Sequence, residues 1–329
     1  MKRINTILIP LLAAAALSSC SKQAAPDSNF PEDRVIRVEA SVLPSTKGSY
    51  TTYNLSEFAF YSLDFDAFQY QYSKKCSRSP YSFEGYTPSW GWEGDAPLWK
   101  NSSDIVGMIA IAPVHSDYQN LSFDTFNHTH LTGYTFQIQT EQSFSDNDSD
   151  LIGWCEKGRT LDLLNSDKKV NITFQHLLSR LNLTFVLATE FNALAIPTSD
   201  IVSDVVIKDA STEALVQLLP EGNLSAAVTS TSAKDDVKAY NTNWTPASSK
   251  EGRCSSQWEC ILVPETGTGI TISFNVNGKP YICILSGKDL EQGKAHNLTI
   301  NVGKDVATVG SMTIAGWVDS GSNSNLETE

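Results

Sequence analysis

Apolar and polar residues alternate with a two-residue period over several parts of the chain, which is the pattern of half-buried β-strands. Between residues 36 and 42, an apolar residue at every second position alternates with a charged or hydroxyl residue. Residues 170–174 and 181–185 alternate in the same way but in opposite phase. Because a shift of one residue exchanges the two faces of a strand, a bulge, bend or tight turn is expected at residues 176–180.

Other segments are more continuously apolar. Residues 58–72 are rich in aromatic side chains, which favours strand over helix, and residues 105–112 form an apolar run stopped by Pro113, typical of a strand buried on both faces. Further strands are predicted at 201–207, 260–263, 270–276, 281–285 and 298–302, with a tight hairpin turn at Asn277-Gly278, whereas residues 220–256 are expected to be polar and turn-rich. No stretch beyond residue 20 sustains a helical period, so we predict an all-β fold, as a pair of β-sandwiches.

The first twenty residues have a different pattern. Lys2 and Arg3 precede an apolar run that closes with Leu17-Ser18-Ser19-Cys20. The run is too short to span a bilayer stably, so we interpret residues 1–19 as an export signal. Its close resembles the lipobox of bacterial lipoproteins, which implies that Cys20 is lipidated and that several acyl chains anchor the protein. The alternative is an ordinary secretory signal in which Cys20 has no role.

Length and composition predict how the rest of the chain is divided. Residues 20–33 are mainly polar and predict a flexible tether. The remaining chain is longer than one hydrophobic core usually serves, so we expect two domains. The expected bend near residue 176 places them at 34–175 and 176–329.

Charge and cysteine content narrow the choice of partners and covalent links. The 24 basic and 37 acidic residues give a net charge of −13, which argues against a nucleic-acid partner. Five cysteines remain after Cys20, at positions 76, 155, 254, 260 and 283. Cys254 and Cys260 are close enough in sequence to close a small disulfide loop, and free buried thiols are the alternative.

We find no sequence motif for a catalytic, cofactor or metal site. The cluster Asp146 to Asp150 is similar to the start of a calcium loop, but Leu151 and Lys157 stand where that loop needs Gly and Glu. His128 and His130 lack an assignable third ligand, and His176 and His296 are interpreted as packing residues. We therefore predict no enzyme activity, metal or cofactor. A hydrolase with paired carboxylates is an alternative that only spatial proximity would reveal.

Three tryptophans lie in a Gly/Pro-rich segment, at positions 90, 92 and 99. Their rings are of the type that stacks on carbohydrate. Packing in a core or against a strand is the alternative that residue burial favours.

Several local patterns together resemble the fimbrillin family of Bacteroidales, the Mfa-like and FimA-like lipoproteins that build or decorate type V pili. The matching segments, in chain order, are Cys20, residues 34–42 with Thr46-Lys47, 105–113, 150–154, 174–181, 262–264, Gly293 with 298–300, and 312–317. They cover nearly the whole chain after the leader.

The resemblance implies two transthyretin-like β-sandwich domains and a structural or adhesive role. It also implies that a lipidated precursor reaches the outer membrane, that an arginine-specific protease trims the N-terminal strand, and that a strand of another fimbrillin subunit fills the resulting groove. Arg34 and Arg37 lie at the matching place. The alternative is that both merely lie on the polar side or edge of a strand.

The C-terminal segment 306–318 is apolar enough to serve as a donor strand. Its alternation predicts Val309 on one face and Met312 and Ile314 on the other, followed by Trp317. It could equally close its own domain. We therefore predict a lipid-anchored fimbrillin-type pilus subunit or adhesin; the alternative is a monomeric surface lipoprotein that binds glycans or host proteins through aromatic loops.

Overall fold

The computed structural model describes residues 29–43, 50–64, 69–79, 89–116, 118–119, 122–123, 131–143, 148–221, 223–267 and 269–317. Within these ranges the chain forms strands in four sheets and one short 3-10 helix, η1 (Thr189–Asn192). The all-β prediction is confirmed.

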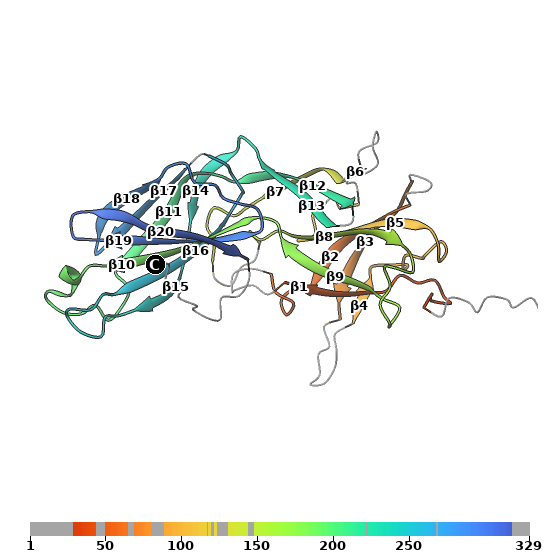
Figure 1. The fold of residues 1–329 in the computed structure, drawn as a ribbon, viewed down its shortest axis with the longest axis horizontal. Helices are drawn as coiled ribbons and strands as arrows, with labels where there is room; N and C mark the ends of the chain where they lie inside the picture. Colours follow the sequence, from red (N-terminus) through yellow and green to blue (C-terminus); the bar gives the residue numbers. More distant parts are fainter. Residues whose placement is uncertain are drawn as a thin grey trace, which may run out of the picture.

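In chain order, the strands lie first towards one end of the long axis of the molecule and then towards the other, except that the strands at 213–221 and 223–230 lie with the first nine (Figure 1). The first nine are β1 (Val38–Val42), β2 (Glu57–Asp64), β3 (Gln69–Arg78), β4 (Trp90–Trp92), β5 (Ile105–Ala112), β6 (Ser122–Phe123), β7 (Leu131–Gln137), β8 (Ile152–Arg159) and β9 (Val170–His176). The others are β10 (Ser179–Leu187), β11 (Val202–Ser211), β12 (Glu213–Glu221), β13 (Asn223–Ser230), β14 (Lys234–Lys238), β15 (Tyr240–Thr245), β16 (Ser255–Leu262), β17 (Ile270–Val276), β18 (Lys279–Leu285), β19 (Lys294–Val302) and β20 (Ala307–Gly316).

The first half of the chain is built around a seven-stranded sheet with the order β1-β9-β8-β5-β2-β3-β4. The chain before β1 meets the chain around β4, because Trp92 Nε1 donates to the carbonyl of Ile36 at 2.7 Å and the amide of Ile36 donates to Pro97 O at 2.9 Å. The two edges of the sheet therefore approach one another and enclose a core.

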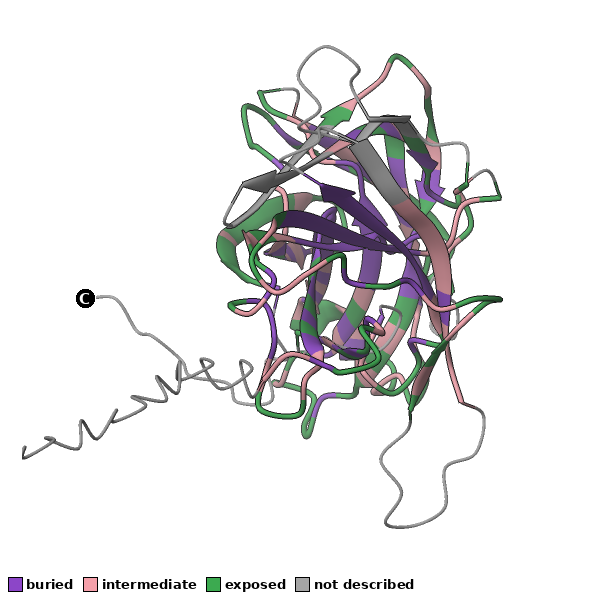
Figure 2. Ribbon diagram, turned by 90° about the vertical axis from the view of Figure 1, so that its right-hand side faces the viewer, coloured by how far each residue is buried: buried purple, intermediate pink, exposed green. Residues whose placement is uncertain are grey.

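The middle of this sheet, at β2 and β5, is buried on both faces, as the apolar run 105–112 predicted. Met108 and Ala110 of β5 belong to the enclosed core with Phe58 and Phe174, whereas Ile109 and Ile111 face a second core on the opposite side. Figure 2 shows these buried strands in purple at the centre of the view. Strands buried on both faces lose the polar alternation of half-buried strands.

A four-stranded sheet, β13-β12-β7-β6, supplies the cover for the second core. Its strands come from both halves of the chain, since Glu213 of β12 is paired with Gln137 of β7. Figure 1 shows β12 and β13 lying against β8, away from the strands that follow them in sequence.

The expectation that residues 220–256 are turn-rich is wrong, because most of the segment forms β13, β14 and β15. Each of these strands lies at the edge of a different sheet. Edge strands keep much of their surface in solvent, so they tolerate the polar composition that suggested loops.

Apart from β12 and β13, the second half of the chain forms a sandwich of two sheets, β15-β16-β10-β19-β20 and β14-β11-β17-β18. Phe185 of β10 and Phe274 of β17 meet between them, with their ring centroids 4.6 Å apart. The hairpin predicted at Asn277-Gly278 joins β17 to β18, and both residues have positive φ, 51° and 78°. These dihedrals fit the tight turns that connect twisted strands.

The bend expected at residues 176–180 is confirmed. β9 ends at His176 in the seven-stranded sheet, and β10 begins at Ser179 in the five-stranded sheet. Leu177 and Leu178 between them are buried in the core that runs on into the second sandwich. The division into domains 34–175 and 176–329 stays a prediction.

The five cysteines of the described chain are buried free thiols, so Cys254 and Cys260 form no bridge. Burial raises the pKa of Cys76, Cys260 and Cys283. These residues behave as small packing groups.

Candidate functional site

The residues that the sequence marks for processing and assembly lie at two places, before β1 and along β20. Three other residues fall outside the described part of the chain: the predicted lipidation residue Cys20 and the weighed metal ligands His128 and His130. Asp146 of the acidic cluster also lies outside it.

Arg34 and Arg37 lie in the exposed segment that leads into β1. Arg34 has a positive φ of 57°, and its Nη1 donates to Lys100 O at 3.5 Å. Arg37 donates through Nη1 to Asp33 Oδ1 at 3.1 Å, and this hydrogen bond lowers the pKa of Asp33 to about 2. Both guanidinium groups are exposed, so the segment presents two arginines to solvent.

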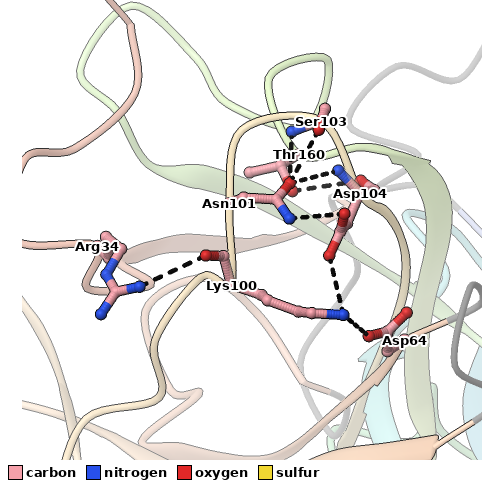
Figure 3. Close-up of polar contacts among 7 residues, drawn as sticks. All are labelled: Arg34, Asp64, Lys100, Asn101, Ser103, Asp104 and Thr160. Atoms are coloured by element: carbon pink, nitrogen blue, oxygen red, sulfur yellow. Dashed lines mark hydrogen bonds and ion pairs between the residues drawn. The ribbon is translucent and has the colours of Figure 1, made fainter.

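The loop that receives Arg34 is held by a polar network (Figure 3). Lys100 Nζ lies 2.9 Å from Asp64 Oδ2 and 3.4 Å from Asp104 Oδ2, and these contacts raise the pKa of Lys100. Asn101 Oδ1 accepts the backbone N–H groups of Ser103 and Asp104, both at 2.8 Å. The loop therefore offers a fixed surface beside the candidate cleavage residues.

Both arginines precede β1 and are not part of it. Chain cleavage after Arg37 would leave β1 paired in parallel with β9 and would release Ile36, which is fully buried. The vacated site would adjoin Trp92, whose Nε1 donates to Ile36 O, and the neighbouring Trp99. The segment that such a cut would remove thus contains the buried Ile36 and no strand of the described sheet.

β20 is an edge strand paired antiparallel with β19 of the same chain. A register shift between Leu298 and Ile300 accommodates one extra residue in β20. Gly310 lies at this bulge, where an added Cβ would come within 2.9 Å of Asn301 Nδ2 and 3.0 Å of Thr299 O. A residue larger than glycine would therefore collide with β19.

The bulge changes which side chains of β20 share a face. Val309 is opposite Ile300, Met312 is opposite Leu298, and Ile314 is opposite His296, and all three β19 residues are buried. Directly opposed residues of an antiparallel pair lie on the same face. The expected separation of Val309 from Met312 and Ile314 is therefore wrong, because the extra residue brings all three onto the core side.

This apolar face of β20 is only half covered. Val309 is 41% exposed and Ile314 is 48% exposed, whereas Met312 is partly buried against the core. The remaining residues of β20 are largely exposed as well. β20 is thus an amphipathic edge strand with apolar area still in contact with solvent.

Trp317 follows β20 and anchors the end of the strand. It is 4% exposed, and its ring stacks on His176 with the centroids 4.5 Å apart and an interplanar angle of 11°. His176 Nδ1 lies 2.9 Å from Asp150 Oδ2, which also accepts the Tyr50 N–H at 2.7 Å. We call Asp150, His176 and Trp317 the anchor cluster.

The anchor cluster joins three segments that the sequence analysis matched separately. Asp150 precedes β8, His176 ends β9 and Trp317 follows β20. Within the described chain, His176 Nε2 and Trp317 Nε1 are buried without a hydrogen-bond partner. His176 was expected to be a packing residue, and its position under Trp317 agrees with this, but no local signal could reveal that the three segments meet.

The tryptophans of residues 90–99 are mainly packing residues. Trp99 is 2% exposed, and Trp92 packs on Phe60 with a centroid distance of 5.1 Å. Trp90 packs on Phe58 at 5.0 Å but remains partly exposed. Trp90 lines a surface groove together with Tyr53, and Trp99 lines a second pocket with Arg34 and Lys100.

Among the residues that the structure describes, no group of three His, Cys, Asp or Glu side chains is arranged to hold a metal ion. His296 is buried and accepts the Glu291 N–H at 2.9 Å, and burial lowers its pKa. From residue 29 onward, no described helix has the length and apolar character to cross a membrane.

The sequence matches a family described as fimbrillin-like over residues 60–317. Two solved structures of putative cell adhesion proteins are similar in fold. The one from Bacteroides uniformis is 17% identical, with a TM-score of 0.55 over 88% of this chain and 100% of that chain. The one from Bacteroides ovatus is 11% identical, with a TM-score of 0.56 over 88% of this chain and 99% of that chain. No curated protein matches.

Proposed function

Because this chain belongs to the fimbrillin-like family, we propose that it is a lipid-anchored subunit of outer-membrane pili or adhesive structures that joins neighbouring subunits by strand exchange. A pilus or adhesion subunit is the role that the family supports. The lipid on Cys20, trimming at Arg34 or Arg37 and donation of β20 are the finer parts of the proposal. We assign the chain no catalytic activity, metal or cofactor.

The observation that carries strand exchange is the half-covered apolar face of β20. An edge strand transferred to a neighbouring subunit exchanges one set of main-chain hydrogen bonds for another. Full burial of an aliphatic side chain is worth about 1.5–3 kcal/mol, so covering the exposed halves of Val309 and Ile314 would add about 1 kcal/mol each. A groove on another subunit that fits β20 more closely would therefore bury more of its apolar surface.

The segment before β1 supports an acceptor role. Arg34 and Arg37 are exposed, whereas Ile36, which lies between them in sequence, is fully buried. Cleavage after Arg37 would remove Ile36 from contact with the enclosed core and free the carbonyl of Pro97 and the indole N–H of Trp92. An incoming extended chain could satisfy these groups and fill the same apolar site.

Strand exchange is tested with the purified chain from residue 21 onward and an arginine-specific protease. We expect N-terminal sequencing to find cleavage after Arg34 or Arg37, followed by oligomer ladders that disappear on boiling. The double variant Arg34→Lys, Arg37→Lys should remain intact and monomeric. Arg253→Lys, at another exposed arginine, is the matched control and should behave like the wild type.

The donor is tested by two deletions. Removing residues 306–329 should abolish the ladders, whereas removing only residues 318–329 keeps β20 and Trp317 and should preserve them. Ladders formed without β20 would exclude this strand as the donor. Trimmed protein that stays monomeric over a wide concentration range would contradict polymerisation.

A further inference from the structure

A groove of about 550 Å³ lies on the seven-stranded sheet, between the outer side of β1 and β9 and the turn at residues 51–54. Six residues that line it carry the argument: Glu39, Tyr53, Arg78, Trp90, Asn165 and Asn171. They come from five separate segments of the chain. None of them belongs to β20 or the anchor cluster.

Two aromatic side chains form the apolar part of the groove. Tyr53 is 90% exposed, so nearly its whole ring is available to a ligand. Trp90 is fixed from behind by Phe58, with a centroid distance of 5.0 Å and an interplanar angle of 57°. Rings of this kind provide flat apolar surface with a polar edge, which suits ligands that have both C–H faces and hydroxyl groups.

Polar groups in the groove are held in place by their neighbours. Asn165 Nδ2 donates to Asn171 Oδ1 at 2.6 Å, and Asn165 Oδ1 accepts the N–H groups of Asp167 and Lys169 at 2.9 Å and 3.0 Å. The hydrogen bond from Asn165 fixes the side-chain carbonyl of the exposed Asn171. The Asn171 side-chain amide nitrogen, Nδ2, makes no hydrogen bond within the described chain. It can donate to a ligand without rearrangement.

Charge in the groove favours a neutral ligand. Glu39 is exposed and has no partner among the described residues. Arg78 Nη1 already donates to the carbonyls of Thr52 and Tyr53, both at 3.0 Å, so it stabilises the turn that carries Tyr53. An anionic ligand would meet the Glu39 carboxylate, and the net charge of −13 repels polyanions.

The position of these groups favours a ligand on the face of the sheet. Glu39 and Asn171 are the exposed, alternate residues of β1 and β9, which are paired in register at this place. An added peptide strand would instead need the free edge of β1. We propose that this groove binds a neutral oligosaccharide, with the sugar ring stacked on Tyr53 and its hydroxyl groups bound by Asn171 and Glu39.

The test uses the full chain from residue 21 onward on an array of immobilised neutral and sialylated oligosaccharides, followed by calorimetric titration of the bound neutral sugars. We expect Tyr53→Ala and Asn171→Ala each to weaken binding at least ten-fold. Leu194→Ala and Asn243→Ala, at exposed positions elsewhere, are the controls and should bind like the wild type. Circular dichroism should show the same fold for all four variants.

Absence of any bound oligosaccharide, binding only to sialylated ones, or affinity unchanged in both groove variants would overturn the inference. Binding of a protein ligand that depends on the same residues would overturn the carbohydrate assignment. Oligomer ladders should form normally in Tyr53→Ala and Asn171→Ala. The groove and strand exchange can therefore fail independently.

Discussion

The replacement Trp317→Ala should release β20 from the sandwich while the rest of the fold persists. Trp317 is the buried side chain at the end of a strand whose other residues are mostly exposed. Its ring stacks on His176, which is itself held by Asp150. Removing the indole therefore removes the main side-chain contact that keeps the end of β20 in place.

The size of the effect follows from burial. A tryptophan buries on the order of 200 Å², which corresponds to about 5 kcal/mol at about 25 cal/mol per Å². Truncation of a core tryptophan to alanine typically costs about 3–5 kcal/mol. Because β20 is an edge strand, we expect the substitution to lower mainly the free energy of local opening of β20 and to lower the free energy of global unfolding less.

Hydrogen exchange followed by mass spectrometry measures this opening. A loss of about 3 kcal/mol corresponds to an opening equilibrium more than about 100-fold larger, so amides of residues 307–316 should exchange correspondingly faster. Amides of β17 and β11, which lie in the facing sheet, should change much less. Trp317→Phe should retain most of the protection because it keeps a stacked ring.

Ile314→Ala is the control within the same strand. Ile314 is 48% exposed, so its truncation should cost about 1 kcal/mol and raise exchange by less than ten-fold. Exchange of β20 within about two-fold of the wild type in Trp317→Ala would refute the anchoring role. Equal acceleration throughout the second sandwich would show that β20 does not open separately.

Three further predictions concern the anchor, the processing segment and the leader. Asp150→Asn should lower the free energy of unfolding by about 1–3 kcal/mol in guanidinium titrations, because the buried carboxylate that accepts the Tyr50 N–H and faces His176 is lost. Asp167→Asn, at an exposed position, should change the free energy of unfolding by less than about 0.5 kcal/mol, and equal unfolding midpoints for the two variants would contradict the role of Asp150. The Arg37 hydrogen bond lowers the pKa of Asp33 to about 2, so Asp33 is ionised and paired with Arg37 at neutral pH. Asp33→Asn should therefore speed proteolysis after Arg37, measured by mass spectrometry, whereas Glu32→Gln should not. Unchanged rates would show that the Asp33–Arg37 pair does not protect the peptide bond after Arg37. Cys20→Ala should move the protein out of the outer-membrane fraction, Lys22→Ala should not, and retention of Cys20→Ala there would exclude lipid anchoring through this residue.

Most of the strands and the all-β class follow from patterns that extend over only a few residues. The alternation at residues 36–42 and 170–185, the apolar run 105–112 and the Asn277-Gly278 turn each reflect constraints that act within a few residues. Residues close together in sequence are enough to infer the strand period, burial on one or both faces, and the turn dihedrals. These features could therefore be predicted without knowing which strands are neighbours.

Which segments meet depends on how the strands are ordered in the sheets. The pairing of β12 with β7, the edge positions of β13 to β15 and the bulge that turns Val309 toward the core depend on neighbours far away in sequence. The same holds for Trp317, which stacks on a histidine more than a hundred residues earlier. Side-chain contacts between distant segments follow from the order of strands in the sheets, and local periodicity carries no information about that order.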